Sequence, residues 1–130
     1  MIVLVDTSVW IDFFAGAEAP HVDTLERLLT QGEDVCTSGI ILQETLQGIR
    51  KESAYEKTQH YMDALLYLAS SKQTYISAAN MYRALRRKGI TIRKPVDCLI
   101  AALAISHDVS LLHNDRDFDY IKKHSNLKVL

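Results

Sequence analysis

Several motifs that mark common enzyme classes are missing from this sequence of 130 residues. It has no glycine-rich phosphate loop and no GxSxG motif, which argues against a P-loop nucleotide enzyme and against a serine hydrolase. The five histidines show neither HxxxH nor HEXXH spacing, so we expect no zinc site built on histidines. The two cysteines, Cys36 and Cys98, form no CxxC pair and lie in apolar runs. Buried reduced thiols are the expectation, and a single disulfide is the alternative.

Apolar segments long enough for a membrane are also missing. In the second half of the chain, no segment without a charge or a proline is longer than that from Cys98 to His107, which is far too short to cross a bilayer. The apolar start, Met1 to Val5, lacks the basic region and the length of a signal peptide. We therefore expect a cytoplasmic protein without membrane contact. With 48% apolar residues and no repeat or linker, we expect a single domain over residues 1–130.

Apolar strands alternate with helical patterns along the chain. The run Ile2–Val5 is typical of an interior strand of a parallel sheet that is buried on both faces. Further strands are predicted at 35–37, at 109–113 and, at the end of the chain, at 128–130. Helices are predicted after the cap Asp6 to about Gly16, from Pro20 to about Gly32, from the cap Ser38 to Ile49, and over 53–66, 74–88 and 95–107. This alternation predicts an α/β domain with a mostly parallel sheet.

Two acidic residues directly follow predicted strands. Asp6 comes immediately after Ile2–Val5, and Asp115 follows the strand at 109–113 after a single asparagine. In open α/β sheets, ligands bind outside the carboxyl ends of the strands. If these two strands are parallel neighbours, both carboxylates face the same crevice.

Two more acids lie on helices that begin near the same edge. Asp97 is in the first turn of the helix that starts at Pro95, where the positive helix end stabilises a carboxylate by about 0.3–1 kcal/mol. Glu44 interrupts an apolar helical segment just after a predicted strand. Each acid alone has a structural explanation: Asp6 as a helix cap, Asp97 as a complement to the helix dipole, and Glu44 as the edge of an amphipathic helix.

Taken together, the four acids indicate a site for a divalent cation. Four carboxylates in one crevice repel one another, and burying them without a counter-ion costs several kcal/mol per ion or forces protonation. Oxygen-only ligation suits Mg²⁺ or Mn²⁺, and such an ion polarises a phosphoryl group for attack by water. The combination favours metal-dependent cleavage of a phosphodiester.

A basic stretch offers a surface for a polyanion, although the formal net charge of the chain is only −1. Residues 83–94 contain no acid and carry Arg83, Arg86, Arg87, Lys88, Arg93 and Lys94. Such a stripe would hold the phosphates that flank a scissile bond. A solvated face at the end of a helix is the alternative.

Two other functions based on acidic residues fit the sequence less well. The segment 115–119 begins like a calcium-binding EF-hand loop, but positions six and twelve are Tyr120 and Asn126, where that loop needs glycine and an acid. A receiver-like domain, whose strand-end aspartate accepts a phosphoryl group, would need paired acids after its first strand and a lysine after a late one. Here Asp6 stands alone, and the strand at 109–113 ends without a lysine.

Four segments, in order along essentially the whole chain, resemble a PIN domain, and more specifically a VapC-type toxin of type II toxin–antitoxin pairs. They are Val-Asp-Thr-Ser-Val-Trp-Ile-Asp at 5–12, the helix around Glu44, the segment 87–101 that ends in Lys-Pro-Val-Asp-Cys-Leu-Ile-Ala, and Leu-Leu-His-Asn-Asp-Arg-Asp-Phe-Asp at 111–119. The resemblance implies a PIN-like α/β fold with a central, mostly parallel sheet of about four to five strands flanked by helices.

The resemblance also implies a Mg²⁺- or Mn²⁺-dependent endoribonuclease that leaves 5′-phosphate and 3′-hydroxyl ends. Asp6, Glu44, Asp97 and Asp115 would form its acidic quartet, with Asp6 and Asp97 as the main metal ligands. Thr7 or Ser8 would hold the first acid or a metal-bound water. Asp117 is a fifth candidate, and whether it or Asp115 faces the metal is open.

The partners that the resemblance implies are an RNA substrate, a cognate VapB-type antitoxin that wraps the toxin and blocks its site, and a second copy of the chain in a homodimer. Transfer or ribosomal RNA would be cut to inhibit translation, although no motif excludes messenger RNA. The RNA contacts would be Arg86, Arg87, Lys88, Arg93 and Lys94. The alternative is a PIN-fold module that binds RNA or a protein without cleavage, and the complete quartet argues against it.

Overall fold

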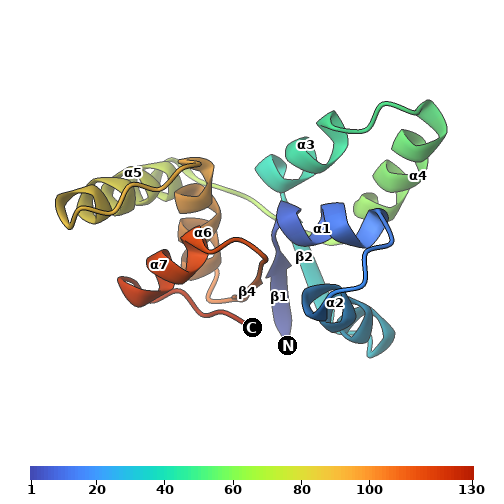
Figure 1. Cartoon of the computed structure of the whole chain (residues 1–130), viewed down its shortest axis with the longest axis horizontal. Coiled ribbons are helices and arrows are strands. Elements are labelled where there is room, and N and C mark those ends of the chain that lie inside the picture. The colour runs from blue at the N-terminus through green and yellow to red at the C-terminus, as the bar shows by residue number, and fades with distance from the viewer.

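The computed structural model describes residues 1–130 and consists of one sheet and seven helices (Figure 1). The strands are β1 (Ile2–Val5), β2 (Asp34–Ser38), β3 (Leu66–Leu68) and β4 (Ser110–Leu112). The helices are α1 (Thr7–Phe14), α2 (Pro20–Thr30), α3 (Gly39–Gln47), α4 (Glu52–Asp63), α5 (Lys72–Arg87), α6 (Val96–Ser106) and α7 (Asp117–Lys123). In Figure 1, α5, α6 and α7 lie to one side of the strands, and α1 to α4 lie to the other. The predicted α/β fold is confirmed.

The strand β1 lies inside the sheet, whose order is β3-β2-β1-β4 and whose strands are all parallel. Leu4 is opposite Cys36 of β2 on one side and Leu111 of β4 on the other. The segment Val3–Val5 has no exposed surface, as expected for an aliphatic run that is covered on both faces. Because the strands run in the same direction, the segments that follow β1, β2 and β4 emerge at one edge of the sheet.

Buried apolar side chains form one core cluster of 26 residues. Trp10 of α1 and Phe118 of α7 are the largest fully buried side chains. Helix α6 is buried along most of its length, which explains its almost entirely apolar sequence and makes the acid Asp97 in its first turn exceptional. Cys36 and Cys98 are free and buried, as predicted, and burial together with nearby carboxylates raises the pKa of Cys98 to about 11.

The structure differs from the prediction in three places. The helix predicted over 53–66 ends at Asp63, and Leu66–Leu68 forms the edge strand β3 beside β2. The predicted terminal strand at 128–130 makes only an isolated bridge between Leu111 and Val129. Helix α7 was not predicted, because its first turn lies in the acidic segment that resembles a calcium loop. For the edge strand and the terminal bridge, pairing with a distant strand decides the backbone, and the local pattern does not report it.

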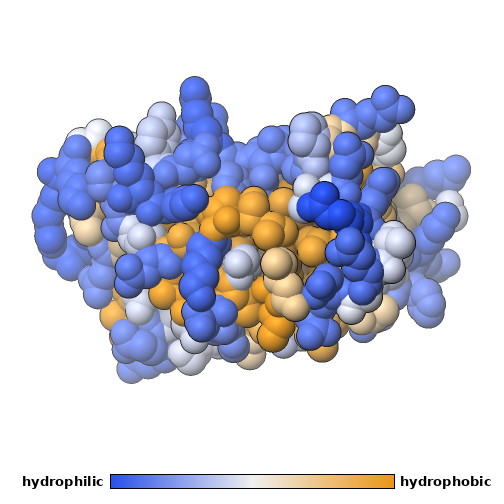
Figure 2. Space-filling view, turned by 90° about the horizontal axis from the view of Figure 1, so that it is seen from below, coloured by the Kyte–Doolittle hydropathy of each residue, from blue (hydrophilic) through white to orange (hydrophobic).

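Both chain ends lie at the amino ends of the strands, opposite the edge from which α1 emerges (Figure 1). Figure 2 views the molecule from the side of the chain ends and shows apolar side chains gathered at the centre of that face. Met1, Ile2 and Leu130 are among the exposed apolar residues of the chain. None of the helices combines the length and the apolar character that crossing a bilayer requires. The acidic residues singled out above belong to the opposite edge.

Candidate active site

Three carboxylates at the carboxyl edge of the sheet lie close enough to share a cation. Asp97 is in the first turn of α6, Asp117 is in the first turn of α7, and Asp115 lies in the loop after β4. Each offers one oxygen, and these oxygens all lie within 4.8 Å of one another. Asp97 and Asp117 are only 2% and 3% exposed. Buried carboxylates at this spacing repel one another, so the arrangement is costly without a counter-ion.

Asp6 lies beside this group and is held by the first turn of α1. Its Oδ2 accepts two hydrogen bonds from Ser8, one from the backbone N–H at 3.0 Å and one from the hydroxyl at 2.6 Å. The Ser8 hydroxyl also accepts the backbone N–H of Asn114 at 3.0 Å, which ties the loop after β4 to α1. Asp6 is not one of the three acids that meet within 4.8 Å, but its charge is close enough to raise the pKa of Asp97.

The surroundings of Asp97 disfavour its charged form. Burial is the largest cause, and together with the charges of the neighbouring aspartates it raises the pKa of Asp97 from 3.8 to about 7, against the opposing charge of Lys94. The Oδ2 atom of Asp97 is buried and has no hydrogen-bond partner. A buried polar atom without a partner is costly, and a divalent cation is the group that would both satisfy this oxygen and favour its charged form.

Asp115 is already paired with cations of the chain. The ammonium of Lys94 lies 2.9 Å from its Oδ2, and the guanidinium of Arg93 lies 3.5 Å from its Oδ1. The same Oδ1 accepts the backbone N–H of Asp117 at 3.0 Å. Although burial opposes them, these hydrogen bonds and charges lower the pKa of Asp115. Both Asp115 and Asp117 thus belong to the acidic group, and Asp115 is the one whose oxygens pair with two cationic side chains.

Glu44 joins the site through Thr7. The Thr7 hydroxyl donates to Glu44 Oε1 at 2.9 Å, which connects α3 to the first turn of α1, one residue after Asp6. The two hydroxyls, predicted as alternative partners of the first acid, therefore have separate partners: Ser8 holds the first acid, and Thr7 holds the glutamate. Of the five predicted acids, the structure brings Asp97, Asp115 and Asp117 within reach of one ion, with Asp6 and Glu44 beside them.

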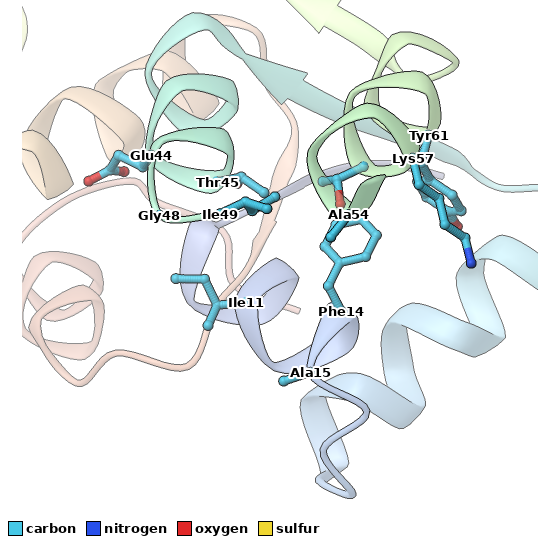
Figure 3. A pocket seen from close by; sticks show the side chains of 11 residues that line it. Ile11, Phe14, Ala15, Glu44, Thr45, Gly48, Ile49, Ala54, Lys57 and Tyr61 are labelled. Atoms are coloured by element: carbon cyan, nitrogen blue, oxygen red, sulfur yellow. The ribbon is translucent and has the colours of Figure 1, made fainter. Parts of the chain in front are cut away.

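An apolar groove of about 570 Å³ lies next to Glu44, between α1, α3 and α4 (Figure 3). Ile11 and Phe14 of α1 line one wall and are 55% and 38% exposed. Tyr61 and Lys57 of α4 line another wall, and Figure 3 shows Glu44 pointing away from them. Exposed apolar side chains that line a groove are typical of a surface that a partner covers.

The imidazole of His113 supports the loop that carries Asp115. Its side chain is largely buried and tilted against Phe118, with 5.0 Å between the ring centroids. Its Nδ1 accepts the backbone N–H of Asp115 at 3.1 Å. Burial lowers the pKa of His113, which favours the neutral ring that this contact requires. His113 is therefore a positioning residue for the acidic loop.

The basic stretch divides into two groups with different surroundings. Arg86, Arg87 and Lys88 are exposed near the end of α5, where Arg86 lies over the ring of Tyr82. Arg93 and Lys94 lie in the loop between α5 and α6 and contact the carboxylates described above. Of the five residues predicted to bind RNA, these two reach the acidic site, and the other three lie outside it.

A polar network of Asp12, His21 and Asn114 was not predicted from the sequence. The Nε2 of His21 in α2 lies 2.6 Å from Oδ2 of Asp12 in α1, and the side-chain amide of Asn114 donates to the same oxygen at 3.5 Å. The network joins α2, α1 and the loop after β4. The available signal was that Asp12 follows Ser8 by four residues and so shares its helix face. The partner His21 is set only by how the two helices pack.

Replacement of Ser8 by alanine is expected to destabilise the fold by about 1.5–3 kcal/mol, because the hydroxyl bonds a carboxylate and also accepts a backbone N–H. Urea unfolding measures this loss. Ser106→Ala is the matched control, since its hydroxyl donates only to a neutral carbonyl, that of Leu103 at 2.9 Å. Equal losses of unfolding free energy in the two variants would show that the contact of Ser8 with Asp6 adds no more stability than an ordinary hydrogen bond.

The chain is similar to known proteins over nearly its whole length, and the PIN domain family matches residues 3–124. Ribonuclease VapC11 of Mycobacterium tuberculosis is 34% identical over 128 residues, covering 97% of this chain and 96% of that protein. Among solved structures, VapBC2 of Rickettsia felis bound to promoter DNA has a TM-score of 0.78 at 22% identity and covers 100% of this chain and 98% of that one. DNA-bound VapBC of Salmonella typhimurium has a TM-score of 0.75 at 26% identity, with 100% and 97% covered. The chain therefore belongs to the PIN domain family and, within it, to the VapC ribonucleases.

Proposed function

We propose that the chain is a metal-dependent endoribonuclease, the toxin of a type II toxin–antitoxin pair, and that residues 1–130 act as a single PIN domain. The observation that carries this proposal is the buried, unpartnered Oδ2 of Asp97 within a group of carboxylates at the carboxyl edge of the sheet. The membership of the chain among the VapC ribonucleases supports RNA as the substrate. Transfer or ribosomal RNA, cut to inhibit translation in the cytoplasm, is the proposed target.

The residues of the site suit Mg²⁺ or Mn²⁺. All candidate donors are carboxylate oxygens, which these hard cations prefer. Asp97, Asp115 and Asp117, whose oxygens lie within 4.8 Å of one another, would hold the ion, and Asp6 beside them would be a further ligand. When bound, a divalent ion supplies the Lewis acidity that polarises a phosphodiester. Ser8 keeps Asp6 in place, and Thr7 holds Glu44 where its carboxylate would orient the attacking water.

Cations of the chain would admit the substrate to this acidic edge. An RNA backbone carries a negative charge at each nucleotide, and lysine and arginine side chains neutralise it. Arg93 and Lys94 at the site would face the phosphate that is cut, whereas Arg86, Arg87 and Lys88 would contact flanking phosphates.

The groove beside Glu44 suits the antitoxin partner. The similar solved structures are toxin–antitoxin complexes, and we propose that a segment of a VapB-type antitoxin lies in this groove. An amphipathic segment that covers Ile11 and Phe14 would bury exposed apolar surface directly beside Glu44, and would so hinder access to the site. The homodimer stays a prediction, which the molecular mass of the chain in solution tests.

The purified chain is expected to cleave RNA in the presence of Mg²⁺ or Mn²⁺ and to stop when EDTA removes the ion, because the carboxylates alone cannot stabilise charge on a phosphate. Adding excess Mg²⁺ restores cleavage. A gel of end-labelled RNA measures the rate, and chemical analysis of the products tests for 5′-phosphate ends.

An Asp6→Asn protein purified in parallel reports any contaminating nuclease. Cleavage that continues unchanged in EDTA would contradict the proposed metal dependence. Binding of RNA without cleavage at saturating Mg²⁺ would favour the alternative, a PIN-fold module that binds and no longer cuts.

A further inference from the structure

Lys94 places a positive charge inside the carboxylate group. Its backbone carbonyl accepts the N–H of Asp97 at 2.9 Å, which fixes Lys94 directly ahead of α6. Its Nζ lies 2.9 Å from Oδ2 of Asp115. The same charge lowers the pKa of Asp97, against the effect of burial. Although its side chain is 51% exposed, the ammonium is thus paired with an acid of the site, unlike the cations at the end of α5.

Both oxygens of Asp115 have partners within the chain, and Oδ2 of Asp117 accepts the backbone N–H of Arg93 at 3.1 Å, whereas Oδ2 of Asp97 has no partner. Lys94 takes Oδ2 of Asp115, and Oδ1 accepts the backbone N–H of Asp117 and faces the guanidinium of Arg93. In contrast, Oδ2 of Asp97 is buried without a partner, and both hydrogen bonds to Asp6 reach its Oδ2 and leave Oδ1 free of them. A cation that enters the site therefore meets free oxygens on the Asp97 side and an ammonium on the Asp115 side.

The charges of the four aspartates, counted without Glu44 and its hydrogen bond from Thr7, balance with one divalent ion. Four aspartates lie at the site, and two cations of the chain are paired with them: Lys94 with Asp115, and Arg93 with both Asp115 and Asp117, the latter with 3.5 Å between Nε and Oδ2. One divalent ion supplies the remaining two positive charges. A second ion would have to displace Lys94 from Asp115 and would carry the aspartate cluster past neutrality, which electrostatic repulsion opposes.

We propose that Lys94 takes the place of a second metal ion: the site binds one divalent cation on the Asp97 side, and the ammonium supplies the other positive charge that faces the substrate phosphate. This inference rests on the proposed function, because it assumes that the carboxylates hold a divalent ion. It assigns to Lys94 a role in setting how many ions the site holds, beyond general attraction of RNA.

Counting bound ions tests this assignment without measuring activity. Metal-stripped protein is titrated with Mn²⁺, and electron paramagnetic resonance of free Mn²⁺ gives the number bound per chain. We expect one ion in the wild type, two ions in Lys94→Met, and one ion in Lys94→Arg, which keeps the charge. Lys88→Met is the matched control, because its ammonium contacts His124 and no acid of the site. It is expected to bind one ion.

Two ions in the wild type, or a single ion in folded Lys94→Met, would overturn the inference. Circular dichroism checks the fold, and Lys94→Gln serves as the neutral variant if Lys94→Met is unfolded. A wild-type chain that binds no Mn²⁺ would instead overturn the metal centre of the proposed function. The two failures are therefore distinguishable.

Discussion

Replacement of Asp97 by asparagine is expected to lower the rate of RNA cleavage by about a hundred- to a thousandfold, the effect of removing one preorganised group that stabilises developing charge. Asparagine keeps the size of the side chain and removes its charge, so the ion loses a ligand from the most buried part of the site. The fold should survive, because a neutral amide is less costly to bury than a carboxylate. The rate with saturating Mg²⁺, measured on a fixed RNA, reports the loss.

The matched control is Asp63→Asn, an exposed aspartate at the end of α4. This variant makes the same chemical change at a position that is distant in sequence from Asp97, and it is expected to leave the rate of RNA cleavage unchanged. An Asp97→Asn protein that unfolds at the same urea concentration as the wild type and still cuts RNA at the normal rate would refute the assignment.

The stability of the metal-free protein is expected to fall as the pH rises from about 4 to 7. The folded chain holds a proton on Asp97 up to its pKa of about 7, whereas the unfolded chain releases that proton near 3.8. Between these values the folded state binds more protons, so raising the pH favours unfolding. Each unit of pKa difference corresponds to about 1.4 kcal/mol, so the total change is a few kcal/mol.

Urea unfolding in a chelating buffer at several pH values measures this slope. The comparison with Asp97→Asn isolates it, because the variant has no proton to lose at that position while every other group stays. Asp115, whose pKa is lowered, changes the stability in the opposite direction: its contribution is lost as the pH falls below its ordinary pKa. Saturating Mg²⁺ should abolish the decline, since a bound ion stabilises the charged form. Identical slopes for the wild type and Asp97→Asn would contradict the prediction.

Much of the fold follows from local sequence chemistry. Local signals each indicate an element that the structure contains: the aliphatic run Ile2–Val5, the cap Ser38, Pro20 at the start of α2 and Pro95 just before α6. The edge strand Leu66–Leu68 was missed because three residues carry no periodicity and a helical pattern precedes them. For α7, the spacing of Phe118 and Ile121 was the available signal, since both are buried on one helix face.

The site was predictable where it depends on strand ends and less so where it depends on loops. Asp6, Asp97 and Asp115 could be singled out because acids interrupt apolar elements at one kind of position. The ion pair of Lys94 with Asp115 could not, because a cation between two helices is equally compatible with solvent. The link between Thr7 and Glu44 depends on how α3 packs against α1, which no local pattern encodes.

The position of β1 inside the sheet has a consequence for the synthesis of the chain. Val3 pairs with Ser110, so this strand leaves the ribosome well before one of its two neighbours, β4. A nascent polypeptide therefore cannot bring Asp115 and Asp117 to Asp97 until β4 has been made. We expect fragments that end before β4 to have no nuclease activity.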